Sequence, residues 1–143
     1  MGDRARAIVI RTAGTNCDAE MVRAFDMAGA DTELVHLDRL IAEPSLLDRA
    51  DLIGFPGGFS YGDDVAAGRV MAVKIRERLW PALRAAAERG ACMTGACHGF
   101  QVMVQVGLLP WPPDGALSGA PAAPSGGLCP DPPSPSLATR SRV

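Results

Sequence analysis

The sequence predicts an α/β domain with a parallel sheet and helices on both faces. Residues 1–110 alternate short apolar or β-branched runs with amphipathic stretches of helical length. Each apolar run is short enough for a strand buried between two helical layers, and right-handed crossovers between such strands give a parallel sheet. The chain has 143 residues, of which 48% are hydrophobic and 21% charged, so we expect one globular domain.

Four strands and three helices are predicted in order along the chain. The first strand, residues 5–11, reads Ala-Arg-Ala-Ile-Val-Ile-Arg and runs into a Thr-Ala-Gly-Thr-Asn turn. The other strands are expected at residues 32–36, 51–55 and 91–95. A helix over residues 17–29 places apolar side chains at helical spacing and ends at Gly29, a typical C-terminal cap. A long helix over residues 70–89 should kink or break at Pro81, and a last helix over residues 98–106 should end at Gly107.

Composition changes sharply after Pro110. Residues 111–143 contain eight of the 12 prolines, four glycines and five serines, without a hydrophobic period of either kind. We therefore predict residues 1–110 as the folded domain and residues 111–143 as a disordered tail. Two origins of this tail stay open: a frameshift in a GC-rich gene, which the single lysine, Lys74, favours, and a native tether.

Charge and cysteine content argue against several functional classes. Fourteen basic residues against 16 acidic ones give a net charge of −2, which offers no electrostatic support for nucleic acid or anionic lipid. The apolar run near the N-terminus is too short for a secretory or membrane-spanning segment, so we expect a cytoplasmic protein. The four cysteines are irregularly spaced and lack zinc-ligand neighbours, which predicts neither disulfides nor a metal site.

The candidate nucleophile is Cys97, in the strand-to-helix turn Gly-Ala-Cys-His-Gly at residues 95–99. Small flanking residues permit a tight turn that exposes the sulfur at a helix N-terminus, where free N–H groups and the helix dipole favour a thiolate. The alternative is that Cys97 is a small buried apolar residue. Cys92, on the strand, is expected to be structural. Cys17, at a helix start, is expected to be packed, with a reactive thiol as the alternative.

A second candidate element is the glycine-rich loop at residues 55–64. Gly57 and Gly58 follow a predicted strand and could turn backbone N–H groups toward a developing negative charge, as in an oxyanion hole. An ordinary glycine-rich turn is the alternative, but an elbow cysteine on the same sheet edge favours catalysis. The loop carboxylates Asp63 and Asp64 are expected to be solvated.

Several motifs in this order resemble the class I glutamine amidotransferases, and among them the glutaminase subunits of phosphoribosylformylglycinamidine synthases. They are Gly-Thr-Asn-Cys-Asp at 14–18, Phe-Pro-Gly-Gly-Phe-Ser-Tyr-Gly-Asp at 55–63, Cys-His-Gly-Phe-Gln at 97–101 and Gly-Leu-Leu-Pro at 107–110. The resemblance covers nearly all of residues 5–110 and implies a flavodoxin-like parallel sheet. It ends at Pro110, which implies that residues 1–110 are the N-terminal part of an amidotransferase domain that is incomplete at its C-terminal half.

The resemblance also implies the residues' roles. Cys97 would attack the side-chain amide of glutamine, Gly58 and His98 would offer backbone N–H groups to the oxyanion, and Gln101, with Gly57, would hold the substrate. The ammonia would pass to a synthetase subunit that converts formylglycinamide ribonucleotide to the amidine in purine biosynthesis. ATP and magnesium would bind that partner, with no cofactor in this chain.

Two departures from the family pattern bear on activity. Asparagine usually follows the nucleophile, whereas this chain has His98, and the His-x-Glu pair that supplies the general base is missing from the sequence. We do not assign His98 as the base, because neighbouring helical residues do not face each other. We therefore expect a poor glutaminase. The alternatives are a DJ-like cysteine hydrolase, which the Ala-Cys-His-Gly turn partly resembles, and a nonenzymatic partner-binding fragment.

Overall fold

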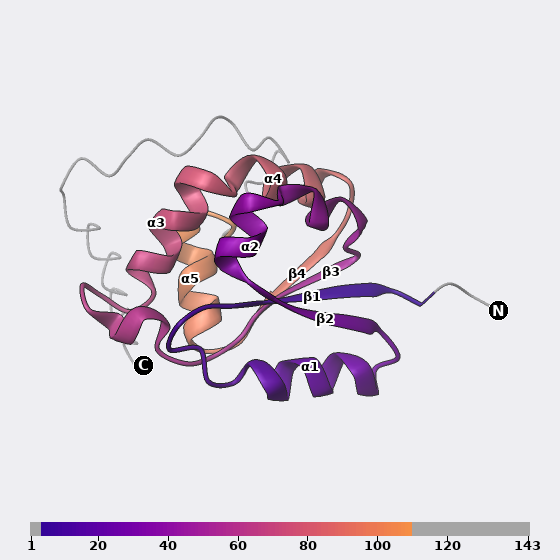
Figure 1. The fold of residues 1–143 in the computed structure, drawn as a ribbon, viewed down its shortest axis with the longest axis horizontal. Helices are drawn as coiled ribbons and strands as arrows, with labels where there is room; N and C mark the ends of the chain where they lie inside the picture. Colours follow the sequence, from indigo (N-terminus) through magenta and orange to yellow (C-terminus); the bar gives the residue numbers. More distant parts are fainter. Residues whose placement is uncertain (1–3, 110–143) are drawn as a thin grey trace, which may run out of the picture.

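Four parallel strands form a single sheet in the computed structural model, which describes residues 4–109 (Figure 1). The strands are β1 (Arg6–Arg11), β2 (Asp31–His36), β3 (Leu52–Phe55) and β4 (Cys92–Gly95), in the spatial order β2-β1-β3-β4. All three pairings are parallel. The four predicted strands are confirmed to within one residue at each end.

The sheet is buried on both faces around its two central strands. Side chains of successive strand residues point to opposite faces, so Ile8 and Ile10 of β1 enter the main apolar core while Val9 faces the other way. Val9 pairs with Gly54 of β3, and on that face α1 (Asp18–Met27) lies so close that a Cβ on Gly54 would be 2.6 Å from the sulfur of Met21. A side chain at Gly54 would thus require the side chains of Met21 and Phe25 of α1 to shift.

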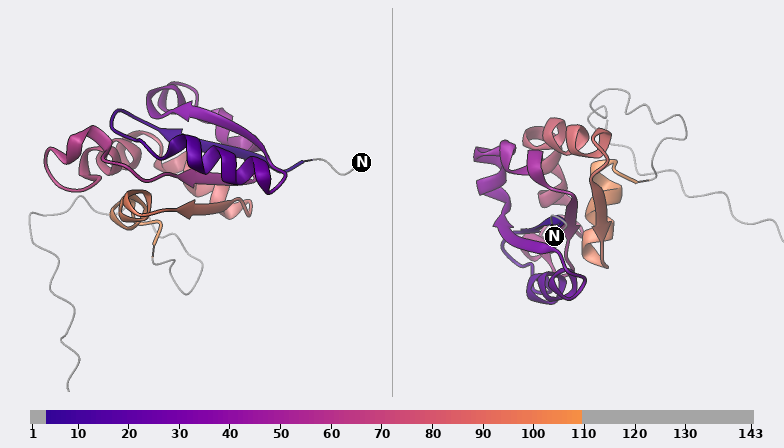
Figure 2. Two further views of the ribbon diagram at one scale, coloured as in Figure 1. Left: turned by 90° about the horizontal axis from the view of Figure 1, so that it is seen from below. Right: turned by 90° about the vertical axis from the view of Figure 1, so that its right-hand side faces the viewer.

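The other helices cover the opposite face, so helices lie on both sides of the sheet (Figures 1 and 2). They are α2 (Leu37–Ala42), α3 (Arg69–Arg78), α4 (Trp80–Glu88) and α5 (His98–Val106). Their buried side chains pack with those of the strands into one core, whose largest fully buried members include Phe55, Leu37, Ile75, Leu83 and Leu108. This arrangement confirms the predicted α/β fold.

The long predicted helix is divided in two. Its break lies at Leu79, where φ is −119°, and Pro81 occupies the first turn of α4. Proline is favoured there because the first N–H groups of a helix have no intrahelical acceptor. The last helix begins at His98 and ends before Gly107, whose φ of 93° confirms the predicted cap. The short elements α2, η1 (Pro44–Arg49) and η2 (Ser60–Asp63) were not predicted.

Strand β4 lies at an edge of the sheet, paired only with β3 among the described residues. Cys92 and Thr94 of this strand are exposed, because α1 covers β1 and β2 rather than β4. The exposure of Cys92 was not predicted, and its structural role stays a prediction. Within the described range no helix is long and apolar enough to cross a bilayer. The predicted tail, residues 111–143, lies outside the described residues.

Candidate functional site

The loops that follow β1 and β3 are joined by backbone hydrogen bonds at the carboxyl edge of the sheet. Cys17 N–H donates to the carbonyl of Gly57 at 3.2 Å, and Phe59 N–H donates to the carbonyl of Gly14 at 2.8 Å. A third hydrogen bond, from Tyr61 N–H to the carbonyl of Ala13 at 2.7 Å, extends the pairing. The glycine-rich loop is consequently held by the neighbouring loop instead of standing free in solvent. Ligand sites of open parallel sheets form at this edge.

Two glycines make this pairing possible. A Cβ on Gly14 would be 2.0 Å from the carbonyl oxygen of Phe59, and a Cβ on Gly58 would be 2.7 Å from the backbone nitrogen of Asn16. Their φ values, 84° and 138°, also lie where side chains are strained. The glycines at these two positions are therefore required by the close approach of the loops.

Cys97 lies at the apex of a strained turn between β4 and α5. Its φ of 50° and ψ of −112° are unusual for a residue with a side chain, and its position is the N-cap of α5. The sulfur-bearing residue is exposed. This geometry confirms the predicted strand-to-helix elbow, and it excludes the alternative in which Cys97 is buried. Strain of this kind concentrates at functional sites.

The Cys97 turn is seated on the end of β3. Ala96 N–H donates to the carbonyl of Phe55 at 3.1 Å, and Gly99 approaches so closely that a Cβ there would be 1.8 Å from the same oxygen. A Cβ on buried Gly57 would in turn be 3.6 Å from the carbonyl oxygen of Ala96. The predicted oxyanion loop and the predicted nucleophile turn are therefore in contact.

The predicted donors are available where the two loops meet. In the described part of the chain, neither Gly58 N–H nor His98 N–H donates to a backbone carbonyl outside its own helix or strand. Gln101 lies exposed in the first turn of α5, and its N–H donates to the carbonyl of Cys97 at 3.2 Å. The arrangement brings the exposed Cys97, the predicted nucleophile, onto a turn that contacts the loop of the predicted backbone donors, as acyl transfer would require.

The imidazole of His98 is buried and turned toward the glycine-rich loop. Its Nε2 accepts from Ser60 N–H at 3.1 Å and lies 2.6 Å from the Ser60 hydroxyl. Its Nδ1 is 3.7 Å from a carboxylate oxygen of Asp63, and that oxygen also accepts from Gly68 N–H at 3.2 Å. Asp63 was expected to be solvated, and its side chain is only partly so, 25% exposed, because it lies beside His98 and accepts from Gly68 N–H. Asp64 is exposed, as expected.

Cys17 is exposed at the N-cap of α1, so the prediction that it is packed is wrong. Its sulfur would be 3.6 Å from a Cβ on Gly57, and the carbonyl oxygen of Ala96 would be equally far from that Cβ. Cys17 therefore lies on the rim of the candidate site. The helix is reached only after the chain has turned at Gly14, which leaves the N-cap residue on the surface.

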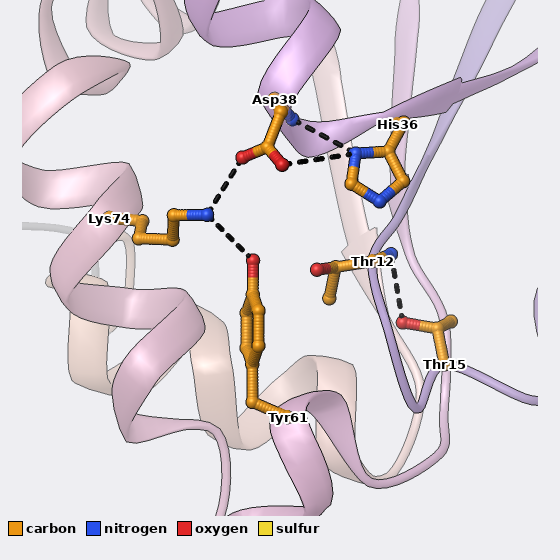
Figure 3. A network of polar contacts seen from close by, with 6 residues as sticks. All are labelled: Thr12, Thr15, His36, Asp38, Tyr61 and Lys74. Carbon is orange, nitrogen blue, oxygen red and sulfur yellow. Dashed lines mark hydrogen bonds and ion pairs between the residues drawn. The ribbon is translucent and has the colours of Figure 1, made fainter.

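A polar network beside the site was not predicted (Figure 3). Lys74 Nζ of α3 is 2.7 Å from a carboxylate oxygen of Asp38 and 3.0 Å from the hydroxyl of Tyr61, and it lies 5.1 Å from the centroid of the Tyr61 ring. The hydrogen bond to Lys74 lowers the pKa of Asp38, and the same bond raises the pKa of Lys74. On the other side of Asp38, its N–H donates to His36 Nδ1 at 3.2 Å.

The network contacts the glycine-rich loop at Tyr61, one residue after Ser60, which contacts His98. Tyr61 has a φ of 54°, a conformation that few residues with side chains adopt, and its hydroxyl is bound by Lys74. The only sequence signal was that Lys74 and Tyr61 are the single lysine and single tyrosine of the chain. Within residues 4–109, no cluster of three or more His, Cys, Asp or Glu side chains could hold a metal ion.

Comparison with known proteins places these features in a family context. The sequence profile of the CobB/CobQ-like glutamine amidotransferase domain matches residues 4–121. The chain is 45% identical over 109 residues to the phosphoribosylformylglycinamidine synthase subunit PurQ of Dehalococcoides mccartyi, and 41% identical over 107 residues to that of Methanococcus maripaludis. A chain in the solved structure of PurLQS from Thermotoga maritima is 38% identical, with a TM-score of 0.62.

These matches cover most of this chain but only part of each relative. The alignments span 76% and 75% of this chain, and 43% and 40% of the two PurQ subunits. The structural match covers 75% of this chain and 46% of the Thermotoga maritima chain. This chain thus spans less than half the length of the curated relatives it matches. At this level of identity, the match confirms the flavodoxin-like arrangement of the sheet and its helices.

Proposed function

The chain belongs to the CobB/CobQ-like glutamine amidotransferase family, and from that premise we propose that it forms the nucleophile-bearing part of a glutaminase. The observation that carries the proposal is the position of Cys97. Its sulfur is exposed at the strained turn before α5, and that turn is seated against the glycine-rich loop. The substrate of the proposed reaction is glutamine, in keeping with the name of the family.

In the proposed reaction, the Cys97 thiolate attacks the side-chain amide carbon of glutamine. The tetrahedral oxyanion accepts hydrogen bonds from the backbone N–H groups of Gly58 and His98, while Gly57 and Gln101 border the substrate. Collapse of this intermediate breaks the carbon–nitrogen bond, and the departing nitrogen takes a proton and leaves as ammonia. Water then hydrolyses the glutamyl thioester to glutamate and restores the thiol.

The proton transfers of this reaction are not assigned to either histidine of the chain. His98 directs both ring nitrogens toward Ser60 and Asp63, and His36 lies at the end of β2 with Nδ1 bound by Asp38 N–H. A missing general acid and base costs about 10²- to 10⁴-fold in rate. We therefore propose that residues 4–109 form the thioester slowly. The buried, engaged ring of His98 gives no support to the DJ-like hydrolase alternative.

We further propose that the ammonia is passed to a synthetase subunit in the conversion of formylglycinamide ribonucleotide to the amidine. Support comes from the names of the relatives, which are subunits of phosphoribosylformylglycinamidine synthase, and from the similarity to a chain of the Thermotoga maritima PurLQS structure. ATP and magnesium would bind that partner. A cytoplasmic location follows from the proposed place in nucleotide synthesis.

The proposal is tested by incubating the full chain with glutamine and measuring intact mass and glutamate release. We expect a glutamyl adduct on Cys97 that is absent from Cys97→Ala and retained in the matched variant Cys92→Ser, whose cysteine is exposed on β4. Gly58→Ala should also slow adduct formation, since its Cβ would collide with the backbone of Asn16. An adduct that persists in Cys97→Ala would overturn the assignment of the nucleophile.

A further inference from the structure

We propose that His98 is a positioning residue whose imidazole, through Ser60, fixes the glycine-rich loop relative to the Cys97 turn. The inference rests on the proposed function for its catalytic meaning, since it concerns the geometry between the sulfur and the oxyanion donors. His98 contributes two separate groups: its backbone N–H is the proposed oxyanion donor, while its side chain is buried and contacts Ser60 of the loop.

The contacts of the ring indicate which of its two nitrogens carries the proton. His98 is 4% exposed and Ser60 is 1% exposed, so water does not compete for their hydrogen bonds. A backbone N–H can only donate, and Ser60 N–H points at Nε2 from 3.1 Å. Nε2 must therefore be unprotonated, which places the proton of the neutral ring on Nδ1. That proton lies on the side of Asp63, whose carboxylate oxygen is 3.7 Å away.

Because of the position of His98 in the chain, its hydrogen bond to Ser60 joins the two parts of the candidate site. His98 directly follows Cys97, and Ser60 stands two residues after Gly58. One hydrogen-bonded bridge thus joins the residue next to the nucleophile to the loop that carries the oxyanion donor. The contacts of Ala96 and Gly99 with Phe55 join only the base of the turn to β3, whereas the bond between His98 and Ser60 joins the turn to the loop beyond Phe59.

The surroundings of the ring leave it little freedom. Gly68 packs over it, such that a Cβ there would be 3.4 Å from Cε1 and 3.5 Å from Nε2 of His98. Asp63, the carboxylate on the Nδ1 side, is itself held by Gly68 N–H. In addition, the side-chain amide of Gln105 on α5 donates to the carbonyl of Ala67. Residues 60–68 therefore contact α5 both at its first residue, His98, and in its last turn, at Gln105.

The first test reads the tautomer of both histidines in the full, ¹⁵N-labelled chain by long-range proton–nitrogen correlation. The spectra are recorded well above the ordinary histidine pKa of about 6.5. We expect the Nδ1–H form for His98 and the opposite, Nε2–H, form for His36, whose Nδ1 accepts from Asp38 N–H. The exposed His36 thus serves as an internal control. An Nε2–H or averaged signal for His98 would overturn the proposal.

The second test compares His98→Gln, which can keep an acceptor near the Nε2 position, with His98→Phe, which cannot. We expect amide hydrogen exchange at Ser60 to rise by about 2- to 10-fold in His98→Phe, the worth of one hydrogen bond, and to be largely restored in His98→Gln. Exchange at Val106 in α5 and Val9 in β1 should stay unchanged. A rise spread over all of these amides in both variants would mean general packing and would overturn the positioning role.

Neither test uses glutamine, so its outcome is separable from that of the proposed function. A chain that forms no glutamyl adduct but shows the expected tautomers and exchange pattern would count against the glutaminase alone. Conversely, an adduct on Cys97 together with an averaged tautomer signal for His98 would support the glutaminase and overturn the positioning role of His98.

Discussion

Gly99 of α5 lies so close to Phe55 of β3 that a Cβ on Gly99 would be 1.8 Å from the Phe55 carbonyl oxygen. Real side chains do not approach a backbone oxygen to this distance, so the glycine is what allows the Cys97 turn to rest on the sheet. The obstacle is backbone rather than a flexible side chain, which leaves no local way to relieve it.

We therefore expect Gly99→Ala to destabilise the fold by about 1–3 kcal/mol or more, the range typical of overpacking. Its matched control is Gly57→Ala in the facing loop, where the nearest atoms to a new Cβ would be 3.6 Å away, an ordinary contact distance. Urea denaturation of the two variants measures the difference. Equal midpoints for Gly99→Ala and Gly57→Ala would contradict the close approach.

The strained backbone of Cys97 makes a second prediction. With φ at 50° and ψ at −112°, a glycine should be preferred over alanine at this position, although glycine costs more backbone entropy. Conformations of this kind cost about 1–3 kcal/mol, so Cys97→Gly should be more stable than Cys97→Ala by roughly 1 kcal/mol.

Cys92 provides a control position at which the alanine variant should be the more stable one. It lies within the extended strand β4, where no positive φ is found, so Cys92→Gly should be less stable than Cys92→Ala by about 0.5–1 kcal/mol. Chemical denaturation of all four variants gives both differences. If glycine is the weaker residue at both positions, the strain at Cys97 is refuted.

The sequence predicted the strands and the Cys97 turn because their signals are local. Residues 8–10, at the centre of the predicted first strand, are three consecutive β-branched residues, and glycines flank Cys97 at fixed spacing, so neither signal needs knowledge of distant contacts. The C-terminal caps of the helices at Gly29 and Gly107 were readable for the same reason, and both glycines have positive φ.

The contacts that assemble the site could not be predicted in this way. Ser60 and His98 are 38 residues apart, and Lys74 and Asp38 are 36 residues apart, so only the folded sheet brings them together. The exposure of Cys17 and Cys92 was missed because it depends on which parts of the sheet α1 covers. The missed helix α2 has six residues, too few to show a helical period.

The ion pair of Lys74 and Asp38 makes stability depend on pH in a defined direction. Because the folded-state pKa of Asp38 is lowered, its contribution is present above the unfolded value near 3.8 and is lost as the pH falls through the folded value. Because the folded-state pKa of Lys74 is raised, its contribution is present below 10.5 and is lost as the pH rises through the folded value.

Between about pH 3.8 and pH 10.5, Lys74→Met should therefore be less stable than the unsubstituted chain. The difference in free energy of unfolding should disappear in acid, where Asp38 is protonated. Carboxyl-carbon NMR should show the pKa of Asp38 rising back toward 3.8 in this variant. The control is Arg39→Met, which breaks a separate surface pair with Glu33 at 2.9 Å and should leave the Asp38 titration in place. Both pairs are exposed, so high salt should shrink each effect. An unchanged Asp38 titration in Lys74→Met would contradict the network.

The neighbouring threonines Thr12 and Thr15 should respond oppositely to the same substitution (Figure 3). Thr12 is 2% exposed, and its hydroxyl has no hydrogen-bond partner among the described residues, whereas the Thr15 hydroxyl accepts from Thr12 N–H at 3.2 Å. Replacing an unpaired buried hydroxyl by a methyl group of similar shape removes a desolvation cost of about 1–3 kcal/mol.

Thr12→Val should thus be neutral or stabilising. Thr15→Val should cost about 0.5–1.5 kcal/mol of stability and weaken the hold on the loop that binds Gly57 and Phe59. Denaturation midpoints measure both effects, and a Thr12→Val variant less stable than Thr15→Val would show that the Thr12 hydroxyl has a partner in solution.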